Sequence, residues 1–430
     1  MIQNESPLLA NSIWSATSNG SVPFKKLSSI EQYDVAIIGG GLSGVSVAFH
    51  CALLGLNACL LEKETIGWGA SGRNGGQVIP GLKELPEAVI GHFGLEMGKK
   101  VIALAGGAPD YVFQLIEKYK IDCSASQNGW IQASVSRNGL DTNKNLFRQW
   151  KDQNAPVELL SKSAIQSLIG SHTYSGGILD QRGGGLHPLN YVTGLAQAAQ
   201  QRGISIYQKC PVVGIKQRGD CYKIECPNGQ ILAGKVVLTT NAYGDSISET
   251  RNKNVIPVQS VQVATAPLSD NILKTILPQG QVVSDTRRLL KYFRIAEDRR
   301  LLLGGRGGVS NRGTARQIED LKQSMSEMFP IIGDVKYDYS WGGNVALTLD
   351  HYPQISTFDN GVISLSGYNG RGVALTTALG KVVAEFLNKV PIEELNFPIK
   401  RLKTIPFSQL HNLVLPLVAW YKKLLDNVER

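Results

Sequence analysis

The clearest pattern of hydrophobic and polar positions lies between Tyr33 and Glu62. YDVAIIGG is a short, continuous apolar run, which is typical of a strand buried on both faces. After the glycine-rich GGGLSG, the segment VSVAFHCALLGL places apolar residues at helical spacing as far as Gly55, and NACLLE is a second apolar run ending on Glu62. The pattern predicts a strand–helix–strand unit of about thirty residues.

Strand and helix patterns return further along the chain. HPLNYVTGLAQAAQQRG predicts an amphipathic helix that stops at Gly203, and ISIYQKCPVVGI resumes strand character. YKIECPNGQILAGKVVLTTNA predicts a hairpin with Asn228 and Gly229 at its turn. Near the end, GVISLSGYNGRG and VALTTALGKVVAEFLNK predict another strand, glycine loop and helix.

Two less regular blocks lie between these segments, one mostly helical over 83–180 and one strand-rich over 255–342. The sequence therefore predicts an α/β protein, α+β overall, in which one inserted module interrupts a nucleotide-binding domain. The predicted division is a nucleotide-binding domain from 30–82, 183–250 and 343–392, an inserted domain with an antiparallel sheet and helices from 83–182 and 251–342, an N-terminal arm over 1–29 and a C-terminal tail over 393–430.

The composition is that of a folded, globular protein. Of the 430 residues, 43% are hydrophobic and 18% are charged, which excludes a disordered chain. No apolar run reaches the ~18 residues of a membrane-spanning helix, and the first thirty residues lack the basic start and apolar block of a secretory leader. The six cysteines form no CxxC and no zinc-ligand cluster, so we expect no metal and a reducing, cytoplasmic location.

The formal net charge is +9, and basic residues are densest between Arg287 and Arg316. Two interpretations are open for this stretch: solvated strand faces and turns, or a field that steers an anionic ligand. No nucleic-acid motif accompanies the charge, so no nucleic-acid partner is expected. The C-terminal FSQLHNLVLPLVAWYKKLL is apolar and then basic, but Pro416 interrupts it, so membrane contact through this tail is not expected.

Gly39-x-Gly41-x-x-Gly44 lies between the buried strand and the helix, where a dinucleotide-binding fingerprint belongs. In that motif the first glycine permits a tight turn, the second lets the backbone approach a pyrophosphate, and the third lets the helix sit close to the strand. The helix start then offers N–H groups and its positive dipole end to the phosphates. Glu62 is placed to accept hydrogen bonds from ribose hydroxyls and to repel a 2′-phosphate, which argues against NADP. The fingerprint alone does not decide between NAD and FAD.

The next segment, ETIGWGASGRNGGQVIPG, has the glycines and small residues of a loop that runs along a flat, extended ligand. With LTTNAY and SLSGYNGRGVALTTALG, it resembles the D-amino-acid oxidase-type family of FAD-dependent amine and amino-acid oxidoreductases, and most of all its gamma-glutamylputrescine oxidase-like branch. The resemblance covers nearly the whole chain. It implies a Rossmann-type FAD-binding domain with an inserted substrate domain, and FAD as the cofactor.

The resemblance also implies which residues contact FAD. They are Gly39, Gly41, Leu42, Ser43, Gly44, Glu62 and Lys63 around the fingerprint; Ser71, Gly72, Arg73, Asn74, Gly75, Gly76 and Gln77 along the pyrophosphate and isoalloxazine; Val212 at the adenine; Thr240 and Ala242 beside the pyrophosphate; and Gly370, Arg371, Gly372 and Val373 at the flavin pyrimidine edge.

Several positions depart from the family pattern. Val345 stands where relatives that oxidise α-amino acids carry an arginine that clamps the substrate carboxylate, so the segment resembles the amine-oxidising branch. No cysteine falls in this segment, which implies non-covalent FAD. Leu302 stands where some relatives place an oxygen-activating lysine, and Arg371 stands where many have histidine.

The resemblance implies hydride transfer from the carbon bearing a neutral primary or secondary amine to flavin N5. The imine then hydrolyses to an aldehyde, and electrons pass to oxygen or another acceptor. Tyr292, Arg294 and His351 are the candidate substrate-binding residues, and the sequence names no catalytic base.

Three alternatives stay open. One is an amino-acid or imino-acid dehydrogenase, acting on a substrate such as pipecolate or proline and passing electrons to a quinone or partner protein. Another is a non-catalytic flavoprotein subunit, and the third is a nicotinamide enzyme.

Overall fold

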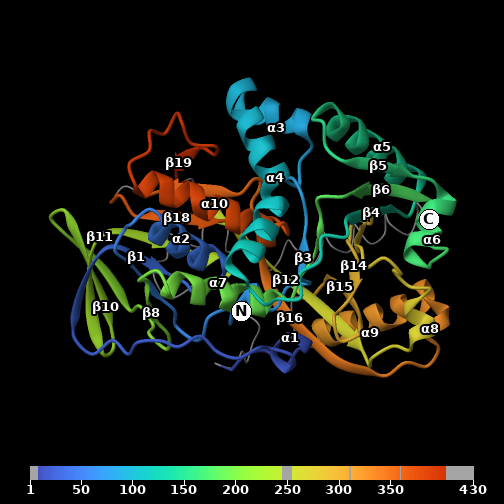
Figure 1. Ribbon diagram of the computed structural model, residues 1–430, viewed down its shortest axis with the longest axis horizontal. Helices are drawn as coiled ribbons and strands as arrows, with labels where there is room; N and C mark the ends of the chain where they lie inside the picture. Colours follow the sequence, from blue (N-terminus) through green and yellow to red (C-terminus); the bar gives the residue numbers. More distant parts are fainter. Residues whose placement is uncertain (1–7, 245–253, 309–310, 359, 403–430) are drawn as a thin grey trace.

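The computed structural model describes residues 8–244, 254–308, 311–358 and 360–402, which form two large sheets lying side by side (Figure 1) and a third, two-stranded one. The first sheet has a parallel centre running β8–β2–β1–β11–β18, with β17 and β19 at one edge and the β9–β10 ribbon joined to β11. Its strands are β1 (Ile30–Ile38), β2 (Ala58–Leu61), β8 (Ser205–Tyr207), β9 (Gly214–Arg218), β10 (Cys221–Cys226), β11 (Gly229–Leu238), β17 (Gln354–Thr357), β18 (Ile363–Ser366) and β19 (Ile399–Arg401).

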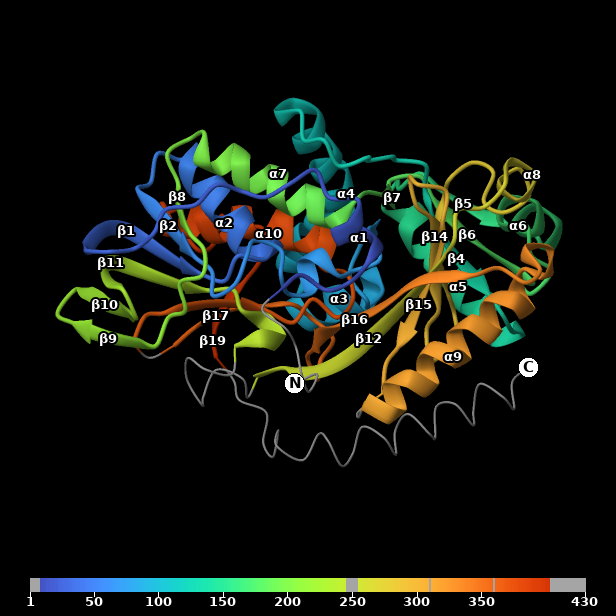
Figure 2. The ribbon, with the colours of Figure 1, turned by 90° about the horizontal axis from the view of Figure 1, so that it is seen from below.

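Strand β1 is buried on both faces at its carboxyl end, as its apolar run predicts. Val35 and Ile37 belong to the core shared with α2 (Leu42–Leu53), α7 (Pro188–Gln200) and α10 (Gly372–Leu387). Ala36 and Ile38 point the other way, into a core shared with β10. The three helices lie together on one side of the sheet (Figure 2), so the end of β1 is held between two apolar layers.

The second sheet has eight strands in the order β16–β12–β15–β14–β13–β4–β6–β5. They are β4 (Trp130–Ser134), β5 (Val157–Leu160), β6 (Gly176–Asp180), β12 (Ile256–Thr265), β13 (Val282–Asp285), β14 (Tyr292–Ile295), β15 (Leu301–Arg306) and β16 (Tyr337–Leu347). Val261, Val263, Leu301 and Leu303 face a core with α9 (Asn311–Met328). Because successive strand residues point to opposite faces, the residues between them face away from α9.

The remaining elements either cover the second sheet or lie between the two large sheets. Those at the second sheet are α5 (Arg137–Asp152), α6 (Lys162–Ile169), α8 (Asp270–Leu273) and the 3-10 turn Pro330–Ile332. Those between the two large sheets are α1 (Ile13–Ala16), the 3-10 turns Ala70–Gly72 and Asn241–Tyr243, the short pair β3 (Gln77–Val78) and β7 (Gly184–Gly185), α3 (Pro86–Phe93) and the long helix α4 (Leu95–Tyr119).

The structure confirms the mixed α/β fold class and the strand–helix–strand unit that opens the first sheet. It also confirms the helices predicted after His187 and near the chain end, and the hairpin of β10 and β11. The strand predicted at PVVGI begins later, at Gly214. The division into domains stays a prediction, and its 342/343 boundary falls inside β16.

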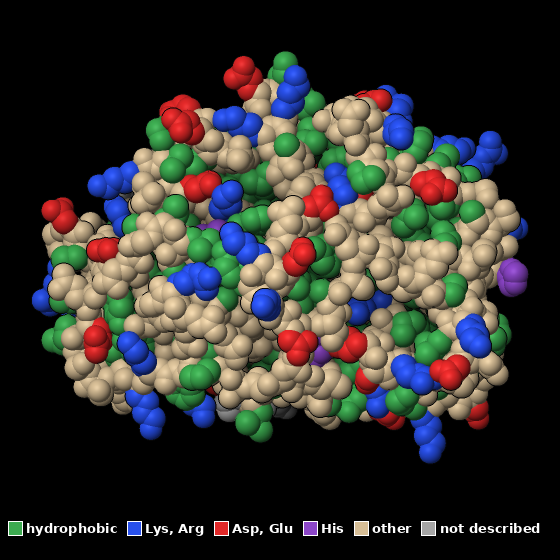
Figure 3. Space-filling view, viewed as in Figure 1, with side chains coloured by type: hydrophobic (Ala, Val, Ile, Leu, Met, Phe, Trp, Pro, Cys, Tyr) green, Lys and Arg blue, Asp and Glu red, His purple; other side chains and the backbone are tan. Residues whose placement is uncertain are grey.

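The basic stretch 287–316 is less solvated than expected. Arg287 is half-buried and paired with Asp285, and Arg294 is buried. Arg300 contacts both Asp298 and Asp338. On the face in Figure 3, basic and acidic side chains are interspersed, without a continuous basic patch.

Among the described residues, no helix is both long and apolar enough to cross a bilayer. The tail segment 407–425, on which the membrane question depends, lies outside them.

Candidate active site

The turn between β1 and α2 has the geometry that its glycines predict. Gly39 has φ +114°, in the region that favours glycine. A Cβ on Gly44 would lie 1.9 Å from the carbonyl oxygen of Gly39, and one on Gly41 would lie 2.8 Å from the Ser71 hydroxyl. Glycine at these positions therefore lets α2 begin directly against the strand and against the residues that follow β2.

The first turn of α2 offers donors to an anion. The N–H of Leu42 already donates to the Ser71 hydroxyl at 2.8 Å. The N–H groups of Ser43 and Gly44 belong to the same turn, where the helix itself provides no carbonyl. These groups and the positive end of the helix dipole form a site suited to a pyrophosphate.

Glu62 follows β2 and turns its carboxylate towards the same loop. Its oxygens accept the N–H of Gly40 at 2.5 Å and the N–H of Glu64 at 2.8 Å. Burial raises the pKa of this carboxyl, and the two backbone N–H groups oppose that shift. The carboxylate is thus fixed in orientation at the end of β2. Lys63 beside it lies 3.9 Å from Glu64 and is exposed.

The two glycine-rich segments near residues 40 and 370 lie against each other. The buried hydroxyls of Ser43 and Tyr368 form a hydrogen bond of 2.6 Å. One turn further on, the Ser46 hydroxyl donates to the Thr377 carbonyl at 2.9 Å, so α2 and α10 begin at the same place. Gly370 has φ +88°, and a Cβ there would meet no atom within 4 Å. The backbone just before α10 therefore borders open space at Gly370.

The loop over Ser71–Gln77 is clamped by side chains from distant elements. The carbonyl of Arg73 accepts the Gln262 amide at 2.6 Å and the Trp341 indole at 2.9 Å. The carbonyl of Asn74 accepts the Trp14 indole at 2.8 Å, while its side-chain oxygen accepts the N–H of Gly76 at 2.8 Å.

The same loop also anchors its own side chains. The Arg73 Nε donates to the carbonyl of Trp68 at 2.8 Å. The Gln77 amide donates to the carbonyls of Val283 and Phe293 at 3.0 and 3.1 Å. Gly72 has no room for a Cβ, which would lie 2.4 Å from the Gly67 carbonyl. The loop is therefore held in one conformation against the second sheet.

The second sheet turns a defined set of side chains towards this loop. Residues paired across strands share a face, so Gln262, which contacts Arg73, is on the same face as its partners Gly304 and Trp341. By the same register this face carries Ser284, Tyr292, Arg294, Leu302, Arg306, Ser260, Gly343 and Val345. In the part of the chain that the structure describes, the buried Oε1 of Gln262 has no hydrogen-bond partner. An unsatisfied buried acceptor beside the loop fits a polar ligand bound against this face of the sheet.

Arg371 precedes α10 and is half-buried. Its guanidinium donates to the carbonyl of Pro80 at 3.0 Å and lies 4.7 Å from the ring centroid of Trp130. Burial lowers the pKa of Arg371 to about 10, and the charge of Asp180 acts in the opposite direction. It remains a cation at neutral pH, at the N-terminal end of α10.

Of the three candidate substrate-binding residues, Tyr292 lies on the loop-facing side of the sheet. Its ring lies against Gly75, where a Cβ would come within 2.8 Å of it. Its hydroxyl is 2.9 Å from that of Ser260. Burial raises the pKa of Tyr292 to about 12, so the phenol is protonated at neutral pH.

Arg294 and His351 have different surroundings. Arg294 donates to the carbonyls of Leu186 and Gly76 at 2.7 and 3.1 Å, so its guanidinium braces the loop. His351 is partly exposed and contacts the Glu84 carboxylate at 2.7 Å, just before α3. The structure thus brings Tyr292 and Arg294 to the loop, and it places His351 beside a surface carboxylate.

The remaining predicted contacts lie at the ends of β11 and β9. Thr240 and Ala242 are in the turn that follows β11, next to Asn241, whose side chain accepts the N–H of Gly367 at 3.1 Å. That bond ties the turn to the segment entering α10. Val212 is buried just ahead of β9.

Sequence reasoning missed Trp14, Gln262 and Trp341, which donate to carbonyls of the loop. Trp14 had a signal, because a tryptophan within the polar segment ANSIWSATSNG is unexpected in a solvated arm. The others become visible only through the strand register.

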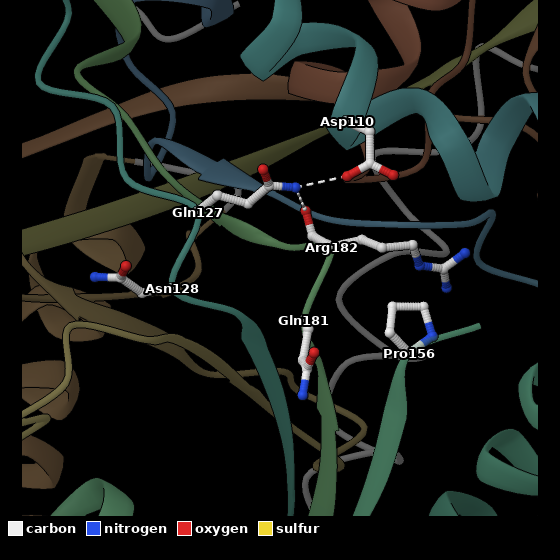
Figure 4. A pocket seen from close by; sticks show the side chains of 6 residues that line it. All are labelled: Asp110, Gln127, Asn128, Pro156, Gln181 and Arg182. Atoms are coloured by element: carbon white, nitrogen blue, oxygen red, sulfur yellow. Dashed lines mark hydrogen bonds between the residues drawn. The ribbon is translucent and has the colours of Figure 1, made fainter.

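A polar depression of about 510 Å³ lies elsewhere, lined by Asp110, Gln127, Asn128, Pro156, Gln181 and Arg182 (Figure 4). The Gln127 amide donates to the Asp110 carboxylate at 2.6 Å and to the Arg182 carbonyl at 2.9 Å. None of the residues predicted to contact FAD lines it.

Two curated proteins similar in sequence are informative. The chain is 33% identical over 375 residues to "Probable oxidoreductase OrdL" of Haemophilus influenzae, which covers 85% of each chain. It is 32% identical over 383 residues to "Gamma-glutamylputrescine oxidoreductase" of Escherichia coli, covering 88% of each.

A glycine oxidase structure from Geobacillus kaustophilus shares the fold, with a TM-score of 0.70 and 21% identity over 84% of this chain and 96% of that one. The family described as "FAD dependent oxidoreductase" matches residues 34–386. The resemblance drawn from the motifs is confirmed, with FAD as the expected cofactor and with a gamma-glutamylputrescine oxidoreductase among the homologues. The chain belongs to the D-amino-acid oxidase-type family of FAD-dependent oxidoreductases.

Proposed function

We propose that this oxidoreductase oxidises a primary or secondary amine of the gamma-glutamylputrescine or polyamine type. The observation that carries the proposal is the meeting of the starts of α2 and α10, tied by Ser43 and Tyr368, opposite a sheet face that carries Tyr292. The relative from Escherichia coli supports the choice of substrate class. Oxygen is the proposed acceptor, and a reducing, cytoplasmic location stays a prediction.

When bound, FAD would supply the hydride acceptor at N5, and the oxidised substrate, an imine, would hydrolyse in water to an aldehyde and an amine or ammonia. The residues suited to hold FAD non-covalently are those of the Gly39–Gly44 turn, the Ser71–Gln77 loop and the Gly370–Val373 segment. The contribution of the chain is positioning and charge. A partly desolvated guanidinium such as that of Arg371 lowers the pKa of a nearby amine and so favours its neutral, reactive form.

Val345 supports an amine over an α-amino acid. It shares the face of Gln262 through its pairing with Val258, and it offers no guanidinium to a substrate carboxylate. Leu302, on the same face, is apolar and buried. A dehydrogenase that uses another acceptor is therefore the second candidate.

The test is anaerobic titration of the purified holoprotein, with loss of the visible flavin absorption as the readout. The panel contains gamma-glutamylputrescine, putrescine, spermidine, proline and pipecolate. We expect rapid bleaching by the amines and reoxidation by air within the turnover time. Bleaching by proline or pipecolate alone would favour the dehydrogenase, and no bleaching at all would favour a non-catalytic subunit.

Arg306 is the proposed recognition group for a carboxylate remote from the reacting amine. It lies directly across from Ser260, whose hydroxyl meets that of Tyr292, and it is half-buried. Burial lowers the pKa of its guanidinium. A charged hydrogen bond in such a place contributes about 1.5–3 kcal/mol.

For Arg306→Met we expect the KM for gamma-glutamylputrescine to rise roughly tenfold to a hundredfold. The KM for putrescine, which has no carboxylate, should change little. Arg316→Met, at an exposed position of α9, is the matched control and should leave both constants unchanged. Equal losses for both substrates would show that Arg306 does not read the carboxylate.

A further inference from the structure

The N-terminal arm reaches the loop over Ser71–Gln77, although the family match begins only at residue 34. Trp14 is fully buried, and its indole N–H donates to the carbonyl of Asn74 at 2.8 Å. Its ring lies edge-on to His187 and Trp341, with centroids 5.0 and 6.3 Å away. One side chain of the arm thus touches the loop, the second sheet and the start of α7.

The arm is fixed on both sides of Trp14. Ser12 and Ser15 form a reciprocal capping box around α1. Beyond the helix, the Thr17 hydroxyl lies 3.0 Å from Nε2 of His187, and the Asn19 N–H donates to the Asn190 side chain at 2.9 Å. Burial lowers the pKa of His187 to about 4, so this imidazole is neutral at pH 7. These contacts define where the indole enters the interior.

The hydrogen bond to Asn74 also sets the direction of a peptide group. In a trans peptide the C=O and the following N–H point in opposite directions, and the described chain contains no cis peptide. Because the Arg73 and Asn74 carbonyls point to donors from the sheet and the arm, the N–H groups of Asn74 and Gly75 point to the other side of the loop.

We propose that Trp14 is a positioning residue for FAD, because it fixes the Asn74–Gly75 peptide with the Gly75 N–H presented to the cofactor. The carbonyls of Arg73 and Asn74 differ in how many side-chain donors they accept. Arg73 has two donors, Gln262 and Trp341, whereas the Asn74 carbonyl accepts a side-chain hydrogen bond from Trp14. Removing the Trp14 donor therefore releases the Asn74–Gly75 peptide group. Removing the Trp341 donor still leaves the Arg73 carbonyl bonded to Gln262.

The first test is Trp14→Phe, which keeps an aromatic ring and removes the N–H donor. We expect the dissociation constant of FAD to rise roughly tenfold, and the shape of the visible flavin band at saturating FAD to change. Trp341→Phe should weaken FAD binding by less than about threefold, because Gln262 remains bonded to Arg73.

Tyr337→Phe is the matched control, since it removes a side-chain hydrogen bond to a carbonyl, that of Lys322 in α9, 3.1 Å away. It should alter neither FAD affinity nor the flavin band. The proposal is overturned if Trp14→Phe lowers the melting temperature while FAD affinity and the band stay as in the unmodified protein. It is overturned as well if Trp341→Phe weakens FAD binding as much as Trp14→Phe does.

A second test needs no variant. Amide hydrogen exchange is compared in the unmodified protein with and without FAD. We expect the Gly75 N–H to exchange more slowly in the FAD-bound protein than in the FAD-free protein. Equal exchange in the two states would contradict the proposal even if Trp14→Phe did not fold.

Discussion

Replacing Gly44 with alanine is expected to abolish FAD binding and to destabilise the protein by about 3 kcal/mol. The added Cβ would lie 1.9 Å from the Gly39 carbonyl oxygen and 2.6 Å from the Thr239 hydroxyl. A backbone atom cannot move aside as a flexible side chain can, so α2 would have to shift away from β1. The flavin absorbance of the purified variant and its thermal unfolding measure the two effects.

Gly107→Ala is the control for this change, because it also adds a methyl group to a helix, within α4. No atom lies within 4 Å of a Cβ at Gly107. Alanine has the higher helix propensity, so the control should be neutral or more stable by up to about 1 kcal/mol. A Gly44→Ala protein that retains stoichiometric FAD would disprove the close approach of α2 to β1.

Replacing Asp180 with asparagine is expected to cost about 3–5 kcal/mol of unfolding free energy, as breaking a buried ion pair does. Asp180 is 1% exposed. Its two carboxylate oxygens accept Nε and Nη2 of Arg182 at 2.9 and 2.6 Å. The same carboxylate favours the charged form of Arg371, so the variant leaves two largely buried guanidinium groups without their counter-charge. Denaturant unfolding of the holoprotein measures the loss.

The ion pair of Asp270 with Arg299 provides the comparison for Asp180. Its side chains are 77% and 47% exposed, so solvent screens the pair. Asp270→Asn should therefore change the stability by less than about 1 kcal/mol. If Asp180→Asn proved as mild as Asp270→Asn, the Asp180 carboxylate would not be a significant counter-charge for Arg182 and Arg371.

The local parts of the site were readable from the sequence. The Gly39–Gly44 turn, the acid at the end of β2 and the helix after Arg371 each depend on residues close together in the chain. Each of these patterns follows from a local physical requirement, such as glycine at a positive φ or apolar residues along one face of a helix. Motif resemblance supplied the link between the two glycine-rich segments, and the hydroxyl pair of Ser43 and Tyr368 is its structural counterpart.

The other parts of the site depend on which strands are neighbours in the folded sheets, and the sequence does not show this. Arg294 was expected at the substrate, but its contacts with two carbonyls follow from the place of β14 beside the loop. Trp14 lies 60 residues from Asn74 in sequence, and nothing local identifies that partner. The sequence could not show that basic residues of the 287–316 stretch are paired, because some of their acidic partners, such as Asp338, come from other segments.

The strand order of the first sheet has a consequence for synthesis on the ribosome. Strand β1 emerges early, yet its neighbour β11 ends at Leu238, and β18, the neighbour of β11, ends at Ser366. The edge of β1 that pairs with β11 therefore stays unpaired until residue 238 has left the exit tunnel, and the edge of β11 that pairs with β18 stays unpaired until residue 366 has left it. The Rossmann-type sheet is completed only when most of the chain has been made. Nascent chains of this protein are thus expected to engage chaperones that shield apolar surface, and translation pauses before residue 366 should prolong that engagement.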